Sequence, residues 1–206
     1  MMFNPAIILT SSRILLAPFF ALFFLKSAEK GLMEVDMTWF FLSVLVVVLI
    51  EISDAFDGII ARARGEVTRF GKIFDPICDS ISRQTVFLSF LAAGIIPVWM
   101  FMIFFYRDSL LSFIRIMNAV SGTVTAARLS GKLKAVFQAL GIALVLAVIP
   151  VQNMTGLIPP EVWGRHPGFW IMVFPAFFTF VSMFDYIVPS WPVIKEMAEP
   201  EKGDRG

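Results

Sequence analysis

Six apolar runs, each about long enough to cross a lipid bilayer, limit what this chain can fold into. A transmembrane helix needs about 20 consecutive apolar residues. Runs of this kind occupy residues 6–25, 38–60, 77–96, 97–117, 135–151 and 168–189. Hydrophobic residues make up 58% of the chain and charged residues 16%, a balance typical of an integral membrane protein. The sequence therefore predicts an all-α, polytopic membrane protein with six transmembrane helices.

The third and fourth runs are separated least clearly. Only Gly94, Ile95, Ile96 and Pro97 lie between them, and glycine with proline predicts a tight turn there. The chain of 206 residues is expected to form one membrane domain over residues 1–194. Residues 195–206 are charged and contain glycine, which predicts a disordered tail.

Basic residues are distributed unevenly between the two sides of the predicted membrane domain. Six spans place both termini, the loops 62–74 and 107–134, and the tail on one side. Of the 17 lysines and arginines, the opposite side holds only Lys26, Lys30 and Arg165. The positive-inside rule makes the basic side cytoplasmic. The expected location is thus the cell (inner or plasma) membrane, with a cytoplasm-facing polar site, and the net charge of +1 suggests no nucleic-acid partner.

Two pairs of aspartates, Asp54 with Asp57 and Asp75 with Asp79, flank the loop between the second and third runs. In a helix, Asp54 and Asp57 share a face with Gly58 and Ala61, and Gly71 shares a face with Asp75 and Asp79. Asp75 suits a helix N-cap, and Pro76 suits the first helical position. Two helix ends would then bring four carboxylates together.

Four clustered carboxylates repel one another unless cations neutralise them. Mg²⁺ and Mn²⁺ prefer oxygen ligands of this kind. Two such ions about 4 Å apart could clamp the attacking and leaving oxygens of a displacement at phosphorus. The alternative is a structural ion-pair network with Arg62, Arg64 and Arg69. The metal site is favoured because charges at membrane depth are costly and usually functional.

The spacing of this segment is more specific than an acidic cluster. It reads D-x2-D-G-x2-A-R-x8-G-x3-D-x3-D and resembles the signature of the CDP-alcohol phosphatidyltransferases. All eight fixed positions are matched, by Asp54, Asp57, Gly58, Ala61, Arg62, Gly71, Asp75 and Asp79. Chain length and the apolar pattern agree with this family as well.

The resemblance implies a role for each matched residue. The four aspartates would hold two divalent cations, Mg²⁺ or Mn²⁺, and Asp79 would also be the general base. The CDP-diacylglycerol site would be formed by Asp54, Asp57, Gly58, Ala61, Arg62 and Gly71, together with Thr10 and Arg13, which match a T-x2-R pattern of the family. Considered without the family, Arg13 would be expected to extend to the membrane interface.

The segment 107–138 carries a second set of cations. Arg107 and Arg115 lie eight residues apart, and Lys132 and Lys134 follow beside Gly131. A phosphate-bearing acceptor needs such donors, although a basic loop also serves as a topology signal. The Arg107-Asp108 pair, Arg115 and a G-K-x-K-x3-Q stretch ending at Gln138 resemble the branch of the family that uses sn-glycerol 3-phosphate.

The match to that branch is incomplete. Asp108, Ala135 and Ser80 stand where the branch commonly has Glu, Thr and Lys. The stretch Ser112 to Arg115 also resembles relatives that use inositol phosphate.

The expected function is transfer of a phosphatidyl group from CDP-diacylglycerol to sn-glycerol 3-phosphate, with release of CMP. The partners would be these two substrates and the lipid bilayer, and a homodimer is compatible with this function. Inositol phosphate, inositol or serine are alternative acceptors. An aspartate-rich prenyltransferase would lack the D-G-x2-A-R element, and an ion or metal transporter would place its acids mid-span rather than at helix ends.

Overall fold

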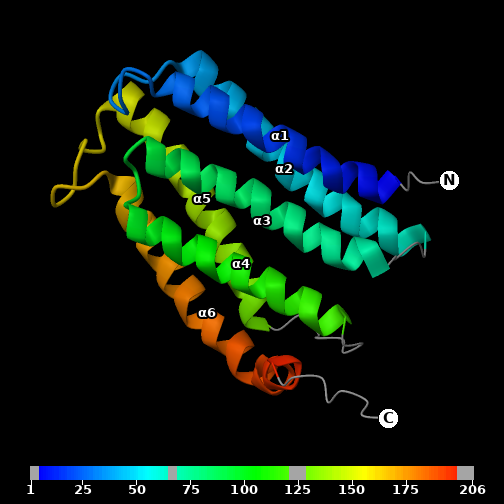
Figure 1. The fold of residues 1–206 in the computed structure, drawn as a ribbon. Helices are drawn as coiled ribbons and strands as arrows, with labels where there is room; N and C mark the ends of the chain where they lie inside the picture. The colour runs from blue at the N-terminus through cyan, green and yellow to red at the C-terminus, as the bar shows by residue number, and fades with distance from the viewer. Residues whose placement is uncertain (1–4, 65–68, 121–128, 199–206) are drawn as a thin grey trace, which may run out of the picture.

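The computed structural model describes residues 5–64, 69–120 and 129–198, which form six α-helices packed into one bundle (Figure 1). The helices are α1 Pro5–Ser27, α2 Met37–Arg64, α3 Arg69–Ala92, α4 Val98–Val120, α5 Leu129–Thr155 and α6 Pro167–Ala198. These described ranges contain no β-strand, and one isolated bridge joins Val162 to Arg165. The prediction of an all-α fold with six helices is confirmed.

The third helix, α3, occupies the middle of the bundle. It packs against α1 on one side and α4 on the other, while α2 packs on α1 (Figure 1). Helix α6 packs against both α4 and α5. Residues of α3 can therefore reach partners on helices from both halves of the chain.

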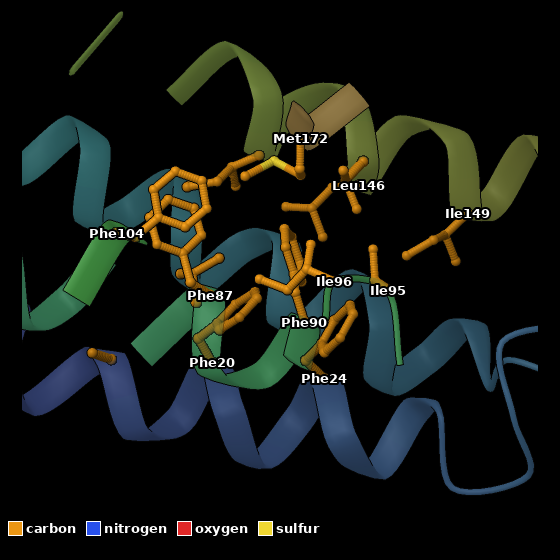
Figure 2. Packing of buried hydrophobic residues seen from close by; sticks show 14 of the residues in the cluster. Phe20, Phe24, Phe87, Phe90, Ile95, Ile96, Phe104, Leu146, Ile149 and Met172 are labelled. Atoms are coloured by element: carbon orange, nitrogen blue, oxygen red, sulfur yellow. The ribbon is translucent and has the colours of Figure 1, made fainter. Parts of the chain in front are cut away.

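Phenylalanine rings fill much of the core between these helices (Figure 2). The rings of Phe87 on α3 and Phe104 on α4 are stacked, with centroids 4.2 Å apart. Phe24 on α1 and Phe90 on α3 lie 5.5 Å apart in a tilted arrangement. Aromatic pairs bury large apolar areas in defined orientations, so this core fixes α1, α3 and α4 relative to one another.

The outer faces of the bundle are also apolar. Each of the six helices exposes large hydrophobic side chains, including Leu15, Phe41, Leu88, Phe113, Val136 and Phe177. Within the described residues, Leu133–Thr155 and Pro167–Pro189 are long and apolar enough to cross a membrane. An apolar surface this extensive is not expected of a protein surrounded by water.

The connection between α3 and α4 is a tight turn, as predicted. Gly94 has φ +76°, a left-handed conformation that glycine adopts without strain. The Ile95 amide donates to the Phe90 carbonyl at 2.9 Å and closes the end of α3. The two helices are thus separate and antiparallel neighbours.

Two predicted boundaries were wrong. Helix α3 begins at Arg69 rather than at Asp75, so Asp75 is not an N-cap and Pro76 lies inside the helix. The Asp75 carboxylate instead accepts a hydrogen bond from Arg13 on α1. Helix α6 continues through Lys195 to Ala198, because the last residues of this helix include good helix formers, and thus enters the predicted tail. Residues 199–206 of that tail lie outside the described ranges.

Candidate active site

The two aspartate pairs lie at the same end of the bundle. Helix α2 ends at Arg64 and α3 begins at Arg69, so a short connection joins the ends that carry them. Helix α2 is continuous through residues 54–64, which places Asp54 and Asp57 on one helical face as predicted. The side chains of residues 54–70 and of Lys132 lie outside the described part of the structure. The roles predicted for Asp54, Asp57, Gly58, Ala61 and Arg62 therefore stay predictions.

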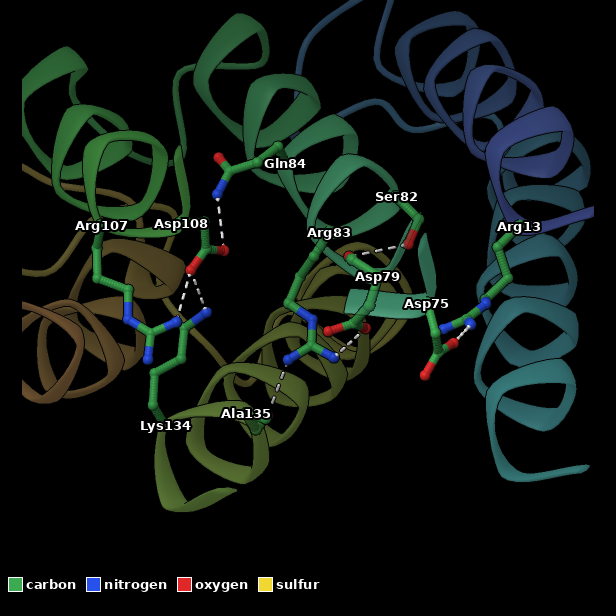
Figure 3. Close-up of polar contacts among 10 residues, drawn as sticks. All are labelled: Arg13, Asp75, Asp79, Ser82, Arg83, Gln84, Arg107, Asp108, Lys134 and Ala135. Atoms are coloured by element: carbon green, nitrogen blue, oxygen red, sulfur yellow. Dashed lines mark hydrogen bonds and ion pairs between the residues drawn. The ribbon is translucent and has the colours of Figure 1, made fainter. Parts of the chain in front are cut away.

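Asp75 and Asp79 occupy successive turns of α3 and are each held by an arginine (Figure 3). Arg13 of α1 donates through Nη2 to Asp75 Oδ1. Arg83, one turn further along α3, donates through Nη2 to Asp79 Oδ1 at 2.7 Å. The two carboxylate side chains remain 51% and 36% exposed, respectively, so a ligand can reach them.

The described half of the predicted metal site fits divalent cations. Asp75 and Asp79 supply carboxylate oxygens, the ligand type that Mg²⁺ and Mn²⁺ prefer. In each carboxylate the arginine contacts Oδ1, which leaves Oδ2 for another ligand. Among the described residues there is no group of three or more metal-binding side chains, and the side chains of Asp54 and Asp57 lie outside them.

Arg13 does not extend to the outer surface of the bundle, as expected of an arginine that reaches a membrane interface. Its residue exposure is 0%, and it points from α1 toward α3 (Figure 3). Thr10, one turn earlier in α1, is buried as well. Both residues of the T-x2-R pattern thus lie inside the bundle, and Arg13 reaches the second aspartate pair.

A second polar cluster is built around Asp108 of α4 (Figure 3). Asp108 Oδ1 accepts hydrogen bonds from Lys134 Nζ at 2.6 Å and from Arg107 Nη1 at 2.9 Å. Asp108 Oδ2 accepts a bond from Gln84 Nε2 at 3.2 Å. This cluster, made of Gln84, Arg107, Asp108 and Lys134, joins α3, α4 and α5, and is called the Asp108 cluster below.

Arg83 lies between the aspartates and the Asp108 cluster. Besides Asp79, its guanidinium donates through Nη1 to the carbonyl of Ala135 on α5 at 3.3 Å. Ala135 directly follows Lys134 in the chain. Arg83 of α3 therefore contacts both the Asp79 carboxylate and α5, the helix that carries Lys134.

The predicted acceptor cations are only partly brought together. Arg107 and Lys134 both donate to Asp108. Arg115 lies two helical turns further along α4, about 12 Å along the axis. Its side chain is partly exposed and makes no hydrogen bond or ion pair with the described residues.

Two partners in this site were missed by the sequence analysis. The Arg83–Asp79 pair has the spacing of four residues that favours side-chain pairing in a helix, so the spacing alone could have suggested it. The Arg13–Asp75 pair joins residues 62 positions apart and has no local sequence signal.

Comparisons with known proteins match most of the chain to one family. A model of the CDP-alcohol phosphatidyltransferase family matches residues 3–181. Three relatives, all named CDP-diacylglycerol–glycerol-3-phosphate 3-phosphatidyltransferase, come from Treponema pallidum, Bacillus subtilis and Escherichia coli K12. The first is 32% identical over 157 residues, covering 75% of this chain and 72% of the relative. The second is 27% identical, covering 94% and 98%, and the third is 26% identical, covering 91% and 94%.

Proposed function

Because the chain belongs to the CDP-alcohol phosphatidyltransferase family, we propose that it transfers a phosphatidyl group from CDP-diacylglycerol to sn-glycerol 3-phosphate and releases CMP. The observation that carries this proposal is the match to relatives of that name over most of both chains. The buried cations of the Asp108 cluster support an acceptor that bears a phosphate.

In this reaction an acceptor hydroxyl oxygen attacks the phosphorus that carries the diacylglycerol. A new P–O bond forms, the P–O bond to the bridging oxygen of the diphosphate breaks, and CMP departs with that oxygen. The hydroxyl proton goes to Asp79. Arg83 donates to Asp79 Oδ1 and so orients the carboxylate that would accept the proton.

The donor is proposed to bind where α1, α2 and α3 meet. Asp54, Asp57, Asp75 and Asp79 would hold two divalent cations, Mg²⁺ or Mn²⁺. When bound, these ions would neutralise charge on the diphosphate. Thr10, Arg13, Gly58, Ala61, Arg62 and Gly71 would line the nucleotide and diphosphate site. Arg13 is fixed for this role because it is buried and tied to Asp75.

We propose that all six helices cross the membrane and that the end of the bundle that carries the two aspartate pairs faces the cytoplasm. Apolar side chains exposed on every helix support six spans. The excess of lysine and arginine at the aspartate end supports the orientation. The lipid tails of the donor would stay in the bilayer while the headgroups meet at the cytoplasmic surface.

A direct acceptor assay tests the proposed function. Purified protein with CDP-diacylglycerol and Mg²⁺ or Mn²⁺ should release CMP fastest with glycerol 3-phosphate, when compared with inositol phosphate, inositol and serine. The reason is that the buried cations must be balanced by an acceptor phosphate. If the protein preferred inositol phosphate, the assigned acceptor would change but the proposed reaction type would stay the same. Preference for serine or inositol would contradict a phosphate-binding role for these cations.

Arg115 is proposed to help hold the acceptor phosphate, together with Arg107, Lys132 and Lys134. Arg115→Ala should raise the apparent KM for glycerol 3-phosphate strongly and leave the KM for CDP-diacylglycerol nearly unchanged. Arg115→Lys should restore only part of the acceptor affinity, because an ammonium group cannot reproduce the two parallel donors of a guanidinium. Steady-state kinetics with each substrate varied in turn measures both values. Equal changes in both KM values would argue against this role.

A further inference from the structure

We propose that Asp108 is a positioning residue whose buried carboxylate fixes Arg107 so that the Nε and Nη2 edge of its guanidinium receives the acceptor's phosphate. This inference rests on the proposed function for the identity of the acceptor. The oxyanion site itself follows from the contacts of the Asp108 cluster.

The Asp108 carboxylate is buried and fully engaged. The residue is 3% exposed, and both of its oxygens accept hydrogen bonds. Lys134 and Arg107 share Oδ1, while Gln84 holds Oδ2. A carboxylate held by three helices cannot rotate without losing these bonds, so it sets the direction of the Arg107 side chain.

Arg107 is only half satisfied in this arrangement. The residue is 6% exposed, and its Nη1 donates to Asp108. Its Nε and Nη2 atoms are buried and have no hydrogen-bond partner among the described residues. Buried donors without an acceptor are costly and uncommon in folded proteins. Two unsatisfied donors on one side chain therefore indicate that an acceptor group belongs beside them.

The geometry of these two donors selects the chemistry of that group. The N–H groups of Nε and Nη2 lie on the same edge of the planar guanidinium and point in parallel directions. Two oxygens of a phosphate match such an edge. The face of the guanidinium is held too, because its Cζ lies 5.6 Å from the ring centroid of Tyr186 on α6.

The charge of the cluster favours an anion as well. Two buried cations, Arg107 and Lys134, surround the one carboxylate of Asp108, which leaves an excess positive charge. A buried excess charge is unfavourable unless it is paired. A phosphate bound to the Nε and Nη2 edge of Arg107 would pair that charge. Asp108 keeps the two cations close together, and without it they would repel each other.

Two substitutions separate the positioning role from a purely structural one. Asp108→Asn keeps the size of the side chain but loses the charge that orders both cations. It should raise the KM for glycerol 3-phosphate about 10- to 100-fold, as expected for a disturbed charged hydrogen bond. The kcat and the KM for CDP-diacylglycerol should change little. Asp108→Glu, which restores the charge, should recover part of the acceptor affinity.

Arg107→Lys tests the Nε and Nη2 edge without removing the positive charge. A lysine can still pair with Asp108 but lacks the Nε and Nη2 donors. The test measures thermal unfolding of the full-length protein in detergent, without divalent cations, in inorganic phosphate and in chloride of equal ionic strength. Phosphate should raise the Tm of the unmodified protein and of the control Lys26→Gln, whose cation lies in an exposed pair with Glu29. It should not raise the Tm of Arg107→Lys or Asp108→Asn.

These measurements distinguish failure of the inferred phosphate site from failure of the proposed function. A phosphate-induced rise in Tm that persists in both variants, or that is absent from the unmodified protein, would overturn the inference. If Asp108→Asn does not fold, Arg107→Lys and Asp108→Glu still decide it. If glycerol 3-phosphate is not a substrate but phosphate stabilises the protein through Arg107, the proposed function fails and the oxyanion site stands.

Discussion

Asp75→Asn should abolish phosphatidyl transfer in a protein that still folds and inserts. The substitution preserves size but removes a negative charge from a site proposed to hold cations. A bound metal supplies several kcal/mol to a transition state of this kind, and each 1.36 kcal/mol is tenfold in rate. A loss of turnover of about 10³-fold or more is therefore expected. Asp57→Asn should behave in the same way.

The structure also offers a competing account of Asp75. Its carboxylate pairs with the buried guanidinium of Arg13, so the pair could serve only to join α1 to α3. The two accounts differ in their response to metal. Turnover of the unmodified protein should depend on added Mg²⁺ or Mn²⁺ and disappear with a chelator, and the variants should not recover at normal metal concentrations. Near-normal turnover of either variant without added metal would contradict the two-metal proposal.

Thermal unfolding provides the control for this experiment. If the Arg13–Asp75 pair is mainly structural, Asp75→Asn should lower the Tm in proportion to its loss of activity. If Asp75 is mainly a ligand, the Tm should change little, because an asparagine oxygen can still accept a hydrogen bond from Arg13. In that case Mg²⁺ or Mn²⁺ should raise the Tm of the unmodified protein but not that of Asp75→Asn.

The helices could be predicted from the sequence because their signals are local. Runs of apolar residues of bilayer length gave all six helices, and Gly94 with Pro97 gave the turn between α3 and α4. The start of α3 was wrong because Asp75 and Pro76 have the local chemistry of a helix start. A partner on another helix, Arg13, uses that carboxylate instead.

The site could be predicted only as a set of residues. Spacing on one helix gave the shared face of Asp75 and Asp79 correctly. It could not show that Asp108, separated from Lys134 by 26 positions, would accept hydrogen bonds from both Lys134 and Arg107. Contacts between helices depend on packing angles and on which face each helix buries. That two buried donors of Arg107 lack a partner among the described residues depends on those contacts and has no sequence signal.

Asp79→Asn should leave the binding of CDP-diacylglycerol largely intact and remove the chemical step. An asparagine can still accept the hydrogen bond from Arg83, so the contact between α3 and its neighbour α5 through that arginine should persist. It cannot take the proton from the acceptor hydroxyl. A positioned general base contributes about 10² to 10⁴ in rate, and a loss of this size is expected in single-turnover measurements.

Ser82→Ala is the matched control for this prediction. Ser82 donates to the backbone carbonyl of Asp79 at 3.1 Å, so its loss disturbs the same turn of α3 but leaves the carboxylate in place. Its single-turnover rate should stay close to that of the unmodified protein. The opposite pattern for Asp79→Asn, a weakened affinity for CDP-diacylglycerol with an unchanged chemical step, would assign Asp79 to metal binding alone. A group other than Asp79 would then have to accept the proton of the acceptor hydroxyl.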